Sequence, residues 1–278
     1  MLEDRLCLIS GGTGVIGRAI VKKLSEEGAR VIVVGRNPDH VASVKDEFRA
    51  DGFVADVSKK EDVIPLLNRV EEAYGKLDVL VTAAGIYGEI GTIWQCEPER
   101  WMDAIRVNLL GTMMMIKYAL PLLKKSLHGR IIAFAGGGDG PLPHFSSYAA
   151  SKGAILRFVE SISQELIPFG ISINAISPGL INSGFVQEIL RVGAERAGEQ
   201  KFKEAQAQIS GTQKTVLPDR AAALIAFLAS DQANGLTGKN FSAVWDAWEQ
   251  FPDHQNEIMS SDIYNWRRIK PGDRGYAW

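Results

Sequence analysis

The stretch Ser10-Gly11-Gly12-Thr13-Gly14-Val15-Ile16-Gly17 decides the fold. It follows a short apolar run over 5–10 and opens a segment with helical periodicity, and a second apolar run over 31–34 then stops at Gly35. This order indicates a strand, a glycine-rich turn, a helix and a second strand. Glycines at 11, 14 and 17 allow a tight turn and close backbone approach, and the amides that start the helix favour a pyrophosphate. The stretch therefore predicts a dinucleotide site within a βαβ unit.

The rest of the chain continues the alternation of strands and helices. Further apolar runs lie at 52–55, 77–81, 130–134 and 171–176, and helical patterns lie between them at 62–74, 98–123 and 147–165. Continuous apolar strands that alternate with helices are typical of a parallel sheet covered on both faces. We therefore predict one Rossmann-type, doubly wound α/β domain over residues 1–244, with a parallel sheet of about seven strands.

Two segments depart from this rhythm. Residues of about 182–216 are polar and interrupted by glycines, which predicts helices of a substrate lid. Residues 245–278 form an aromatic C-terminal extension that is too rich in tryptophan for a disordered tail. We expect it to pack on the domain or on a partner subunit, or to offer a site for an anionic or planar group. Its tryptophans and basic residues are Trp245, Trp248, Trp266, Trp278, Arg267, Arg268, Lys270 and Arg274.

The composition excludes several classes of protein. A formal net charge of −2 gives no general surface for nucleic acid or membrane. The 2 cysteines, Cys7 and Cys96, match neither a zinc site nor a disulfide framework, so we expect no metal and a reducing compartment. There is no signal-peptide pattern and no apolar run of membrane-spanning length. These observations predict a cytoplasmic protein.

Tyr148 and Lys152 stand four positions apart in a segment with a helical pattern, so both side chains leave one face of the helix. A lysine ammonium beside a tyrosine favours the phenolate and lowers the phenol pKa. The pair is then usable as a general acid and base. On its own the spacing is more often that of a solvated helix face, so the surrounding residues decide whether the pair is catalytic.

The end of the second strand bears on the cofactor. An acidic residue there accepts a hydrogen bond from the adenosine ribose, whereas an arginine suits a 2′-phosphate. This chain has Arg36 first in the loop after Gly35 and no carboxylate at the strand end. The sequence therefore favours NADP over NAD, the alternative for Arg36 being an ordinary solvated charge.

Together these motifs resemble the short-chain dehydrogenase/reductase family from about residue 5 to about residue 245. Besides the glycine turn and the Tyr148/Lys152 pair, Asn108 matches the family's active-site asparagine. Other matching elements are Asp56-Val57, Thr82-Ala83-Ala84-Gly85, Ser177-Pro178-Gly179-Leu180-Ile181-Asn182-Ser183 and Leu236-Thr237-Gly238. The resemblance implies an NADP(H)-dependent oxidoreductase that transfers a hydride between nicotinamide and a small carbonyl or alcohol substrate.

The resemblance also implies roles for single residues. Tyr148 exchanges the proton with the substrate oxygen, Lys152 bonds the nicotinamide ribose, and Asn108 holds a water of a proton relay. The implied cofactor-binding residues are Gly11, Thr13, Gly14, Val15, Ile16, Gly17, Arg36, Asp56, Val57, Ala83, Ala84, Gly85, Tyr148, Lys152, Pro178, Gly179, Ile181 and Ser183. Members of this family are usually homodimers or homotetramers, and the helical stretches 98–123 and 147–165 are the expected interface.

One position departs from the family pattern. The family places a serine thirteen residues before its tyrosine, where this chain has Ala135, and a shift by one gives Gly136. Loss of one such donor typically costs a factor of about 10²–10³ in rate. Candidate replacements are Ser146, Ser147, Asp139 and His144.

Three readings of the missing serine remain open. The chain is an active oxidoreductase, a nucleotide-sugar-modifying enzyme that uses bound nicotinamide, or an NADP-binding sensor or scaffold with little turnover. The glycine spacing at 11, 14 and 17 resembles the family's sugar-modifying branch. Retention of Tyr148, Lys152 and Asn108 argues against a pure binder.

Overall fold

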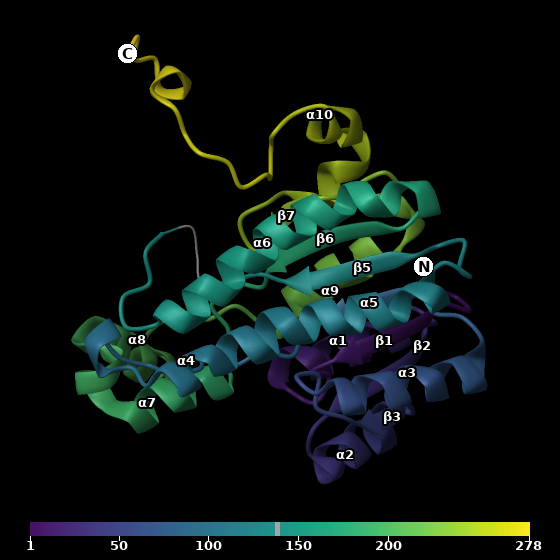
Figure 1. The fold of residues 1–278 in the computed structure, drawn as a ribbon, viewed down its shortest axis with the longest axis horizontal. Helices are drawn as coiled ribbons and strands as arrows, with labels where there is room; N and C mark the ends of the chain where they lie inside the picture. The colour runs from purple at the N-terminus through teal and green to yellow at the C-terminus, as the bar shows by residue number, and fades with distance from the viewer. Residues whose placement is uncertain (137–139) are drawn as a thin grey trace.

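A seven-stranded parallel sheet forms the centre of the molecule in the computed structural model, which describes residues 1–136 and 140–278 (Figure 1). The strands lie in the order β3-β2-β1-β4-β5-β6-β7, and every pairing is parallel. The predicted Rossmann-type sheet is therefore confirmed. The strand bounds are β1 Leu6–Ser10, β2 Arg30–Gly35, β3 Asp51–Val54, β4 Val79–Thr82, β5 Arg130–Phe134, β6 Ser172–Ser177 and β7 Asn240–Ser242.

The strand order reverses beside β1. Ser10, the last residue of β1, pairs with Val34 of β2 on one side and Thr82 of β4 on the other. The loops that follow β1 and β4 therefore leave the same edge of the sheet side by side. In open parallel sheets a crevice for ligands forms at this switch point, outside the carboxyl ends of the strands.

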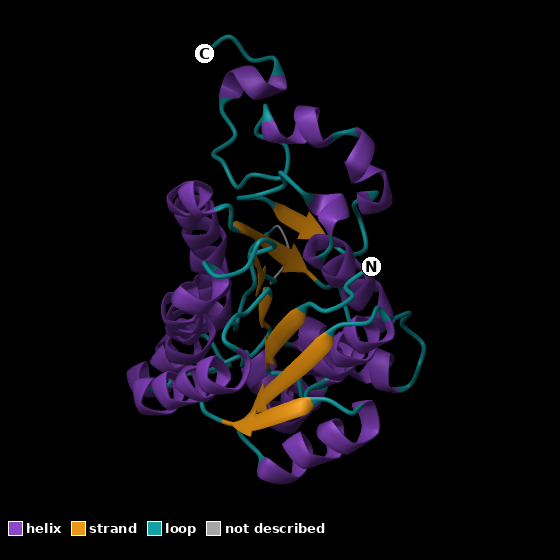
Figure 2. Ribbon diagram, turned by 90° about the vertical axis from the view of Figure 1, so that its right-hand side faces the viewer, coloured by secondary structure: helices purple, strands orange, loops and turns teal. Residues whose placement is uncertain are grey.

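Helices cover both faces of the sheet (Figure 2). Side chains alternate along each strand, so Cys7 and Ile9 face one layer whereas Leu6 and Leu8 face the other. The first layer holds α1 (Val15–Glu26), α2 (Pro38–Phe48) and α9 (Pro218–Ala229). The second holds α3 (Lys60–Tyr74), α5 (Gly111–Leu123) and α6 (Ser146–Leu166).

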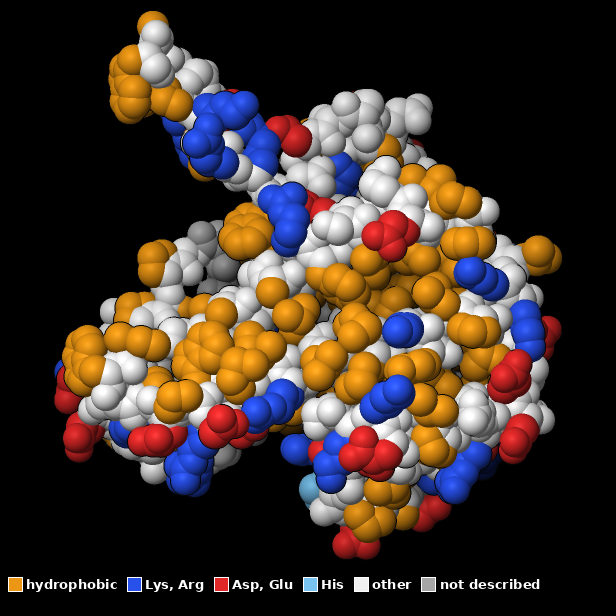
Figure 3. Space-filling view, viewed as in Figure 1, with side chains coloured by type: hydrophobic (Ala, Val, Ile, Leu, Met, Phe, Trp, Pro, Cys, Tyr) orange, Lys and Arg blue, Asp and Glu red, His pale blue; other side chains and the backbone are white. Residues whose placement is uncertain are grey.

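The outer side of the second layer carries apolar side chains, which gather over α5 and α6 (Figure 3). Met113, Leu156, Phe158 and Ile162 are only half-buried there. We refer to this surface as the α5–α6 face. It lies where the sequence predicted a subunit interface.

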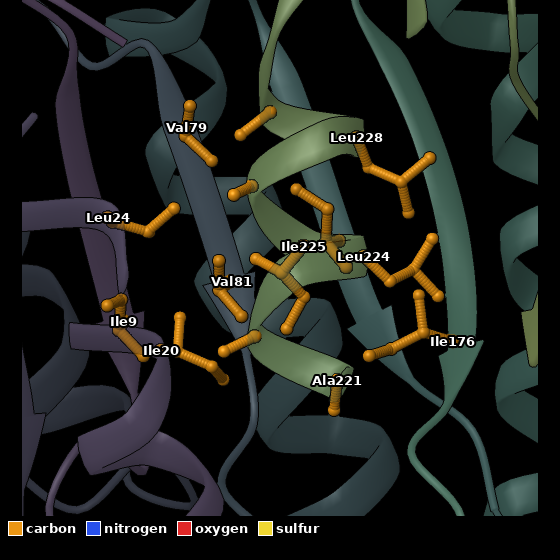
Figure 4. Close-up of a cluster of buried hydrophobic side chains, with 14 of the residues drawn as sticks. Ile9, Ile20, Leu24, Val79, Val81, Ile176, Ala221, Leu224, Ile225 and Leu228 are labelled. Carbon is orange, nitrogen blue, oxygen red and sulfur yellow. The ribbon is translucent and has the colours of Figure 1, made fainter. Parts of the chain in front are cut away.

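The first layer is packed by branched aliphatic side chains from strands and helices (Figure 4). Ile20 and Leu24 of α1 and Leu224 and Ile225 of α9 are fully buried against the sheet. A buried aliphatic side chain of this size contributes about 1.5–3 kcal/mol. The layer holds α1, and with it the glycine turn, firmly against β1.

The predicted helix over 98–123 is interrupted in the structure. α4 (Pro98–Ala104) passes into a π-helical turn at Ile105–Leu110 before α5 begins. Such turns inside α-helices occur frequently at functional sites. This one places the fully buried Asn108 on the side of α6.

The segment predicted as a lid forms α7 (Gly184–Ala197) and α8 (Glu199–Ile209), which lie beside α4 in Figure 1. Gly193 breaks α7, because its φ of 79° lies in the left-handed region that suits glycine. Short 3₁₀ turns elsewhere cover Ile93–Gln95, Ile167–Phe169 and Asp231–Ala233.

The C-terminal extension has two parts. A 3₁₀ turn at Trp248–Asp253 and α10 (Gln255–Met259) pack on the domain, where Trp248 and Phe251 are buried against Phe227 of α9. The last residues project away from the body and include a 3₁₀ turn at Pro271–Arg274 (Figure 1). Among the described residues, no helix combines the length and apolar character needed to cross a membrane.

Candidate active site

The glycines of the first turn occupy positions where a side chain would not fit. A Cβ on Gly11 would lie 2.6 Å from the amide nitrogen of Ala84, and one on Gly17 would lie 2.6 Å from the Gly12 Cα and closer still to the Gly11 carbonyl. Gly14 sits at the N-cap of α1 and has no side chain to cap it, and the first turn of α1 holds no acidic residue. The amides of Val15 and Ile16 therefore start a helix whose N-terminus suits an anionic group.

The residues after β2 and β3 form one rim of this crevice. Arg36 is exposed directly after β2, and the Thr13 side chain packs on the preceding residue, Gly35. Burial opposes ionisation of Asp56, but two hydrogen bonds from Ser58 and the charge of Arg36 outweigh it and hold the pKa of Asp56 below its usual value. Val57 is buried and packs against Gly111, the first residue of α5, which fixes the loop after β3 on the domain.

Asn108 connects the loop after β4 to α6. Its Oδ1 accepts from the Ile86 amide at 2.9 Å, and its Nδ2 donates to the Ile86 carbonyl at 2.9 Å and to Ser151 Oγ at 2.8 Å. Ser151 Oγ in turn donates to the Tyr148 carbonyl at 2.7 Å. The structure therefore brings Asn108 and the first turn of α6 into one hydrogen-bonded unit.

Lys152 lies beside this unit. Its Nζ donates to the Phe134 carbonyl at 2.7 Å, and a Cβ on Gly85 would lie 3.7 Å from Nζ and 3.3 Å from Asn108 Oδ1. Ala83, Ala84 and Gly85 thus keep the space between the glycine turn and Lys152 narrow. Tyr148, Lys152 and Asn108, which come from three segments of the sequence, lie together at the carboxyl edge of the sheet.

Burial dominates the electrostatics of the pair. It raises the pKa of Tyr148 to about 12 and lowers the pKa of Lys152 to about 7. Lys152 Nζ lies 5.8 Å from the centre of the Tyr148 ring, and burial accounts for the raised pKa of Tyr148. The expected lowering of the Tyr148 pKa by Lys152 is therefore not what this structure shows. Tyr148 is a protonated phenol at neutral pH.

The turn after β6 closes the other side of the crevice. Gly179 has a φ of 89°, and a Cβ there would lie 2.5 Å from Val244 Cγ2. Pro178 precedes it, Ile181 is buried, and Ser183 stands at the N-cap of α7. The predicted binding residues of this turn thus lead directly into the lid.

Of the two positions considered for the missing serine, Gly136 and not Ala135 lies beside the Tyr148 hydroxyl. The side chain of Ala135 lies in the core between the sheet and α6, because Ala135 continues the alternation of β5. Gly136 instead faces Tyr148, since a Cβ there would lie 2.8 Å from the Tyr148 hydroxyl. Position 136 therefore lacks any side chain next to the phenol.

The candidate replacements for the serine are engaged elsewhere or lie outside the described residues. Ser146 Oγ accepts from Trp101 Nε1 at 3.0 Å, and Ser147 Oγ donates to the Tyr87 carbonyl at 2.9 Å. His144 Nδ1 is bonded to the Arg196 carbonyl at 2.9 Å. Asp139 belongs to residues 137–139, outside the described part of the chain.

An aromatic cluster that the sequence analysis missed surrounds Tyr148. We define it as Tyr87, Phe145, Tyr148 and Phe185. The ring of Tyr87 lies 5.0 Å from Tyr148 edge-on and 4.3 Å from Phe185 in a stack, and Phe185 lies 5.8 Å from Tyr148. Burial, with smaller effects of Tyr148 and Glu188, raises the pKa of Tyr87. In the sequence, Tyr87 stands two residues after Gly85, and this position could have indicated that its ring lies near the site.

Arg196 ties the end of the lid to the body. Its Nε donates to the Ile90 carbonyl at 2.8 Å, its Nη1 donates to the Gln95 carbonyl at 3.1 Å, and its Nη2 pairs with Glu89. The bond from its carbonyl to His144 adds a contact with the loop before α6. The half of α7 that follows Gly193 is therefore fixed, whereas Phe185 belongs to the half that precedes it.

A glycine cradle for a dinucleotide beside a buried tyrosine–lysine pair defines a nicotinamide-dependent oxidoreductase. The comparisons with known proteins agree with this class. A family model described as Enoyl-(Acyl carrier protein) reductase matches residues 12–243. The chain belongs to the short-chain dehydrogenase/reductase family.

Named relatives span most of the chain. D-beta-hydroxybutyrate dehydrogenase of Cupriavidus necator is 31% identical over 255 residues, which cover 88% of this chain and 97% of that protein. Dehydrogenase/reductase SDR family member 4 of Sus scrofa is 29% identical over 244 residues, covering 86% and 85%. The matched family region ends before the C-terminal extension.

Solved structures share the fold. NAD⁺-bound xylitol dehydrogenase superposes with a TM-score of 0.79 at 26% identity, covering 87% of this chain and 98% of that one. A variant of actinorhodin polyketide ketoreductase with NADPH gives a TM-score of 0.77 at 29% identity, covering 86% and 95%. Both nicotinamide cofactors therefore occur among similar structures.

Proposed function

We propose that this chain is an NADP(H)-dependent oxidoreductase that interconverts a small carbonyl compound and its alcohol, with Tyr148 as the general acid and base. The observation that carries the proposal is the convergence of Tyr148, Lys152 and Asn108 on the crevice beside the glycine turn. When bound, the nicotinamide supplies or accepts the hydride.

The chain's own residues handle the proton. A phenol with a pKa of about 12 is fully protonated near neutral pH, so Tyr148 can donate a proton to a carbonyl oxygen as it becomes an alcohol. Lys152, with a pKa of about 7, can then carry the charge that holds the resulting phenolate. Asn108 fixes the first turn of α6 through Ser151, which keeps Tyr148 in place.

NADP is the proposed cofactor because of the rim after β2. Arg36 is exposed there and available to a 2′-phosphate. Asn37 does not compete as an acceptor for the ribose, since its Oδ1 already caps α2 by accepting from the amides of Asp39 and His40 at 2.8 and 3.1 Å. Asp56 lies one strand further on and is engaged by Ser58.

Titration with NADPH and NADH tests the cofactor assignment. We expect tighter binding of NADPH, and Arg36→Ala should weaken NADPH binding by about ten-fold, the equivalent of one charge-assisted contact, and leave NADH unchanged. Arg69→Ala, an exposed arginine on α3, is the matched control. Equal affinity for the two cofactors would refute the role given to Arg36.

A panel of ketones and alcohols, followed by absorbance at the nicotinamide band, tests the chemistry. Tyr148→Phe removes only the hydroxyl, and we expect a rate loss of about 10²–10⁴ with NADPH binding retained. Tyr118→Phe on α5 is the matched control. If Tyr148→Phe keeps the activity, the mechanism is wrong.

One observation favours a second candidate, an NADP-binding protein with little turnover. Gly136 offers no side-chain donor next to Tyr148, and the aromatic cluster leaves Tyr148 only 8% exposed. Tight NADPH binding without turnover of any carbonyl in the panel would support this sensor or scaffold over the enzyme.

We also propose a homodimer or homotetramer that uses the α5–α6 face, whose apolar side chains suit a subunit contact. The cytoplasm is the proposed compartment, since Cys7 and Cys96 are both free thiols.

A further inference from the structure

The last twelve residues, 267–278, stand apart from the rest of the molecule, and we call them the arm. They lie beyond residues 12–243, the region that the family model matches. In both ribbon views the arm leaves the body and ends away from it (Figures 1 and 2). Its function is therefore not explained by the oxidoreductase fold.

The root of the arm is fixed on α6. The Trp266 amide donates to Glu160 Oε1 at 2.7 Å, and Arg157 Nη2 donates to the Trp266 carbonyl at 2.6 Å. The Trp266 ring covers Gly153, where a Cβ would lie 3.3 Å from it. The arm thus starts from the outer side of α6, beside the α5–α6 face.

A second set of contacts holds the segment that precedes the root. Lys239 Nζ donates to the Ser261 carbonyl, the Ile263 carbonyl and Asn265 Oδ1 at 2.8, 3.0 and 2.7 Å. The Asn240 amide of β7 donates to the Tyr264 carbonyl at 2.9 Å, which covers part of the open sheet edge. The direction in which the arm leaves is therefore set by the body.

The arm has local structure of its own. Arg267 pairs with Asp262 and with Asp273, the latter at 2.6 Å, and the Lys270 amide donates to Asp273 Oδ2 at 2.7 Å. The Tyr276 amide closes the turn on the Pro271 carbonyl at 3.1 Å. A preformed turn lowers the entropy that is lost when a segment binds a partner.

The apolar side chains of the arm are left in solvent. Ile269, Tyr276 and Trp278 are 59%, 60% and 87% exposed, and the rings of Tyr276 and Trp278 lie 6.3 Å apart. Aromatic side chains of this kind are enriched among the residues that dominate binding at protein interfaces. The three side chains are therefore available to a partner surface.

We propose that the arm docks on a second copy of this chain, with Tyr276 and Trp278 as its anchors. The arm is rooted on α6 beside the α5–α6 face, where apolar side chains gather (Figure 3). Leu110 of the neighbouring turn is 39% exposed, and Leu156 and Phe158 of α6 are half-buried. If two copies pair about a two-fold axis through the α5–α6 face, both the face and the exposed side chains of the arm are buried. The reason is that the arm extends beyond its own domain and then lies against the second copy. Each copy gives an arm and receives one.

Photo-crosslinking of the full chain tests the contact directly. We expect Trp278→benzoylphenylalanine to give a covalent dimer on irradiation, with the crosslink mapped by mass spectrometry to a second copy. The control is the same replacement at Trp245, which is 86% exposed but lies outside the arm. Crosslinks only within one chain, or none at position 278, would overturn the proposal.

Sedimentation measures the energetic effect. The full-length double variant Tyr276→Ala/Trp278→Ala should raise the dimer dissociation constant by at least about ten-fold, since two anchors are lost. Trp245→Ala should leave it unchanged. A full chain that is monomeric at all concentrations contradicts the proposal and leaves a different partner as the occupant of the arm. So does an equal effect of the two variants.

Discussion

The two sides of the crevice are built on different principles. On the cofactor side, Gly11 and Gly17 are fixed by backbone atoms that leave no room for a Cβ. On the substrate side, Tyr148 is enclosed by aromatic rings from the loop after β4, the loop before α6 and the lid. Backbone contacts admit one residue type, whereas ring packing admits many. The residues of the cofactor side can therefore be predicted from a single sequence, whereas those of the substrate side cannot.

The largest effect should come from Gly17→Ala. The new methyl would meet the Gly12 Cα at 2.6 Å and the Gly11 carbonyl closer still, and backbone cannot step aside as a side chain can. We expect NADPH affinity to fall by about 100-fold or more, equivalent to about 3 kcal/mol. Calorimetry with NADPH measures the loss.

Gly14→Ala is the matched control for that variant. Its nearest atom would be the Gly11 carbonyl at 3.6 Å, an ordinary contact, and Gly14 has a negative φ of −77°. Affinity should change by less than about three-fold, within the scatter of mild substitutions. Equal losses in the two variants would show that close packing does not distinguish the glycines.

A substitution on the other side should have a smaller effect and act through Tyr148. Gly136→Ser places a side chain on a residue with a φ of 143° and brings its Cβ to 2.8 Å from the Tyr148 hydroxyl. We expect a loss of about 1–3 kcal/mol in the free energy of unfolding, because the backbone conformation is strained for serine. Thermal unfolding measures it, and the pH dependence of phenolate absorbance should shift.

Two variants separate strain from the mere addition of a hydroxyl. Gly140→Ser lies in the same loop with open space around it, so its stability should match the wild type. Ala135→Ser buries its hydroxyl in the core and should give no rate gain on simple carbonyls. A large rate gain on simple carbonyls with Ala135→Ser would show that position 135, and not 136, corresponds to the family's serine.

The contacts of Arg196 offer a way to loosen the substrate side alone. Arg196→Met removes the hydrogen bonds to the Ile90 and Gln95 carbonyls and the pairing with Glu89. We expect a loss of about 1–2 kcal/mol in the free energy of unfolding and faster hydrogen exchange over residues 194–197, the part of α7 that Arg196 holds. NADPH affinity should stay the same.

Arg191→Met, on the same helix, is the control for the lid. An exposed arginine there should leave both exchange and stability near the wild type. Unchanged exchange in Arg196→Met would mean that the lid is held by the aromatic cluster and not by Arg196.

The contrast explains how much the sequence could predict. Apolar strands and the glycine turn gave the correct sheet, because strand burial and backbone sterics leave local signatures. Asn108, Tyr148 and Lys152 met as expected, although the π-helical turn that aims Asn108 had no local signal. The sequence could not decide between Ala135 and Gly136 as the residue beside Tyr148, because that depends on where the side chains of β5 stop alternating between the two faces of the sheet. Phe185 was missed because a lid phenylalanine is ordinary until its partners are known.

The last prediction concerns the pH dependence of stability that Lys152 causes, and it has a definite sign. Its folded pKa of about 7 lies below the value near 10.4 of an unfolded lysine. Between these values the unfolded chain binds a proton that the folded chain lacks, so this group makes the protein more stable as pH rises from 7 to about 10. Lys152→Met removes this pH-dependent contribution to stability. It also lowers stability by an amount that does not change with pH, because the Phe134 carbonyl loses its hydrogen-bond donor.

The quantity to measure is therefore how the difference in melting temperature between Lys152→Met and the wild type changes with pH, and not its absolute size. The melting temperature of Lys152→Met minus that of the wild type should be most positive, or least negative, near pH 7. It should fall by on the order of 10 °C towards pH 10, because a shift of about three pKa units corresponds to about 4 kcal/mol and each kcal/mol to about 2–4 °C. Lys117→Met, an exposed lysine on α5, should run parallel to the wild type. If both differences are flat with pH, burial does not depress the Lys152 pKa, and Tyr148 then stands beside a permanent ammonium.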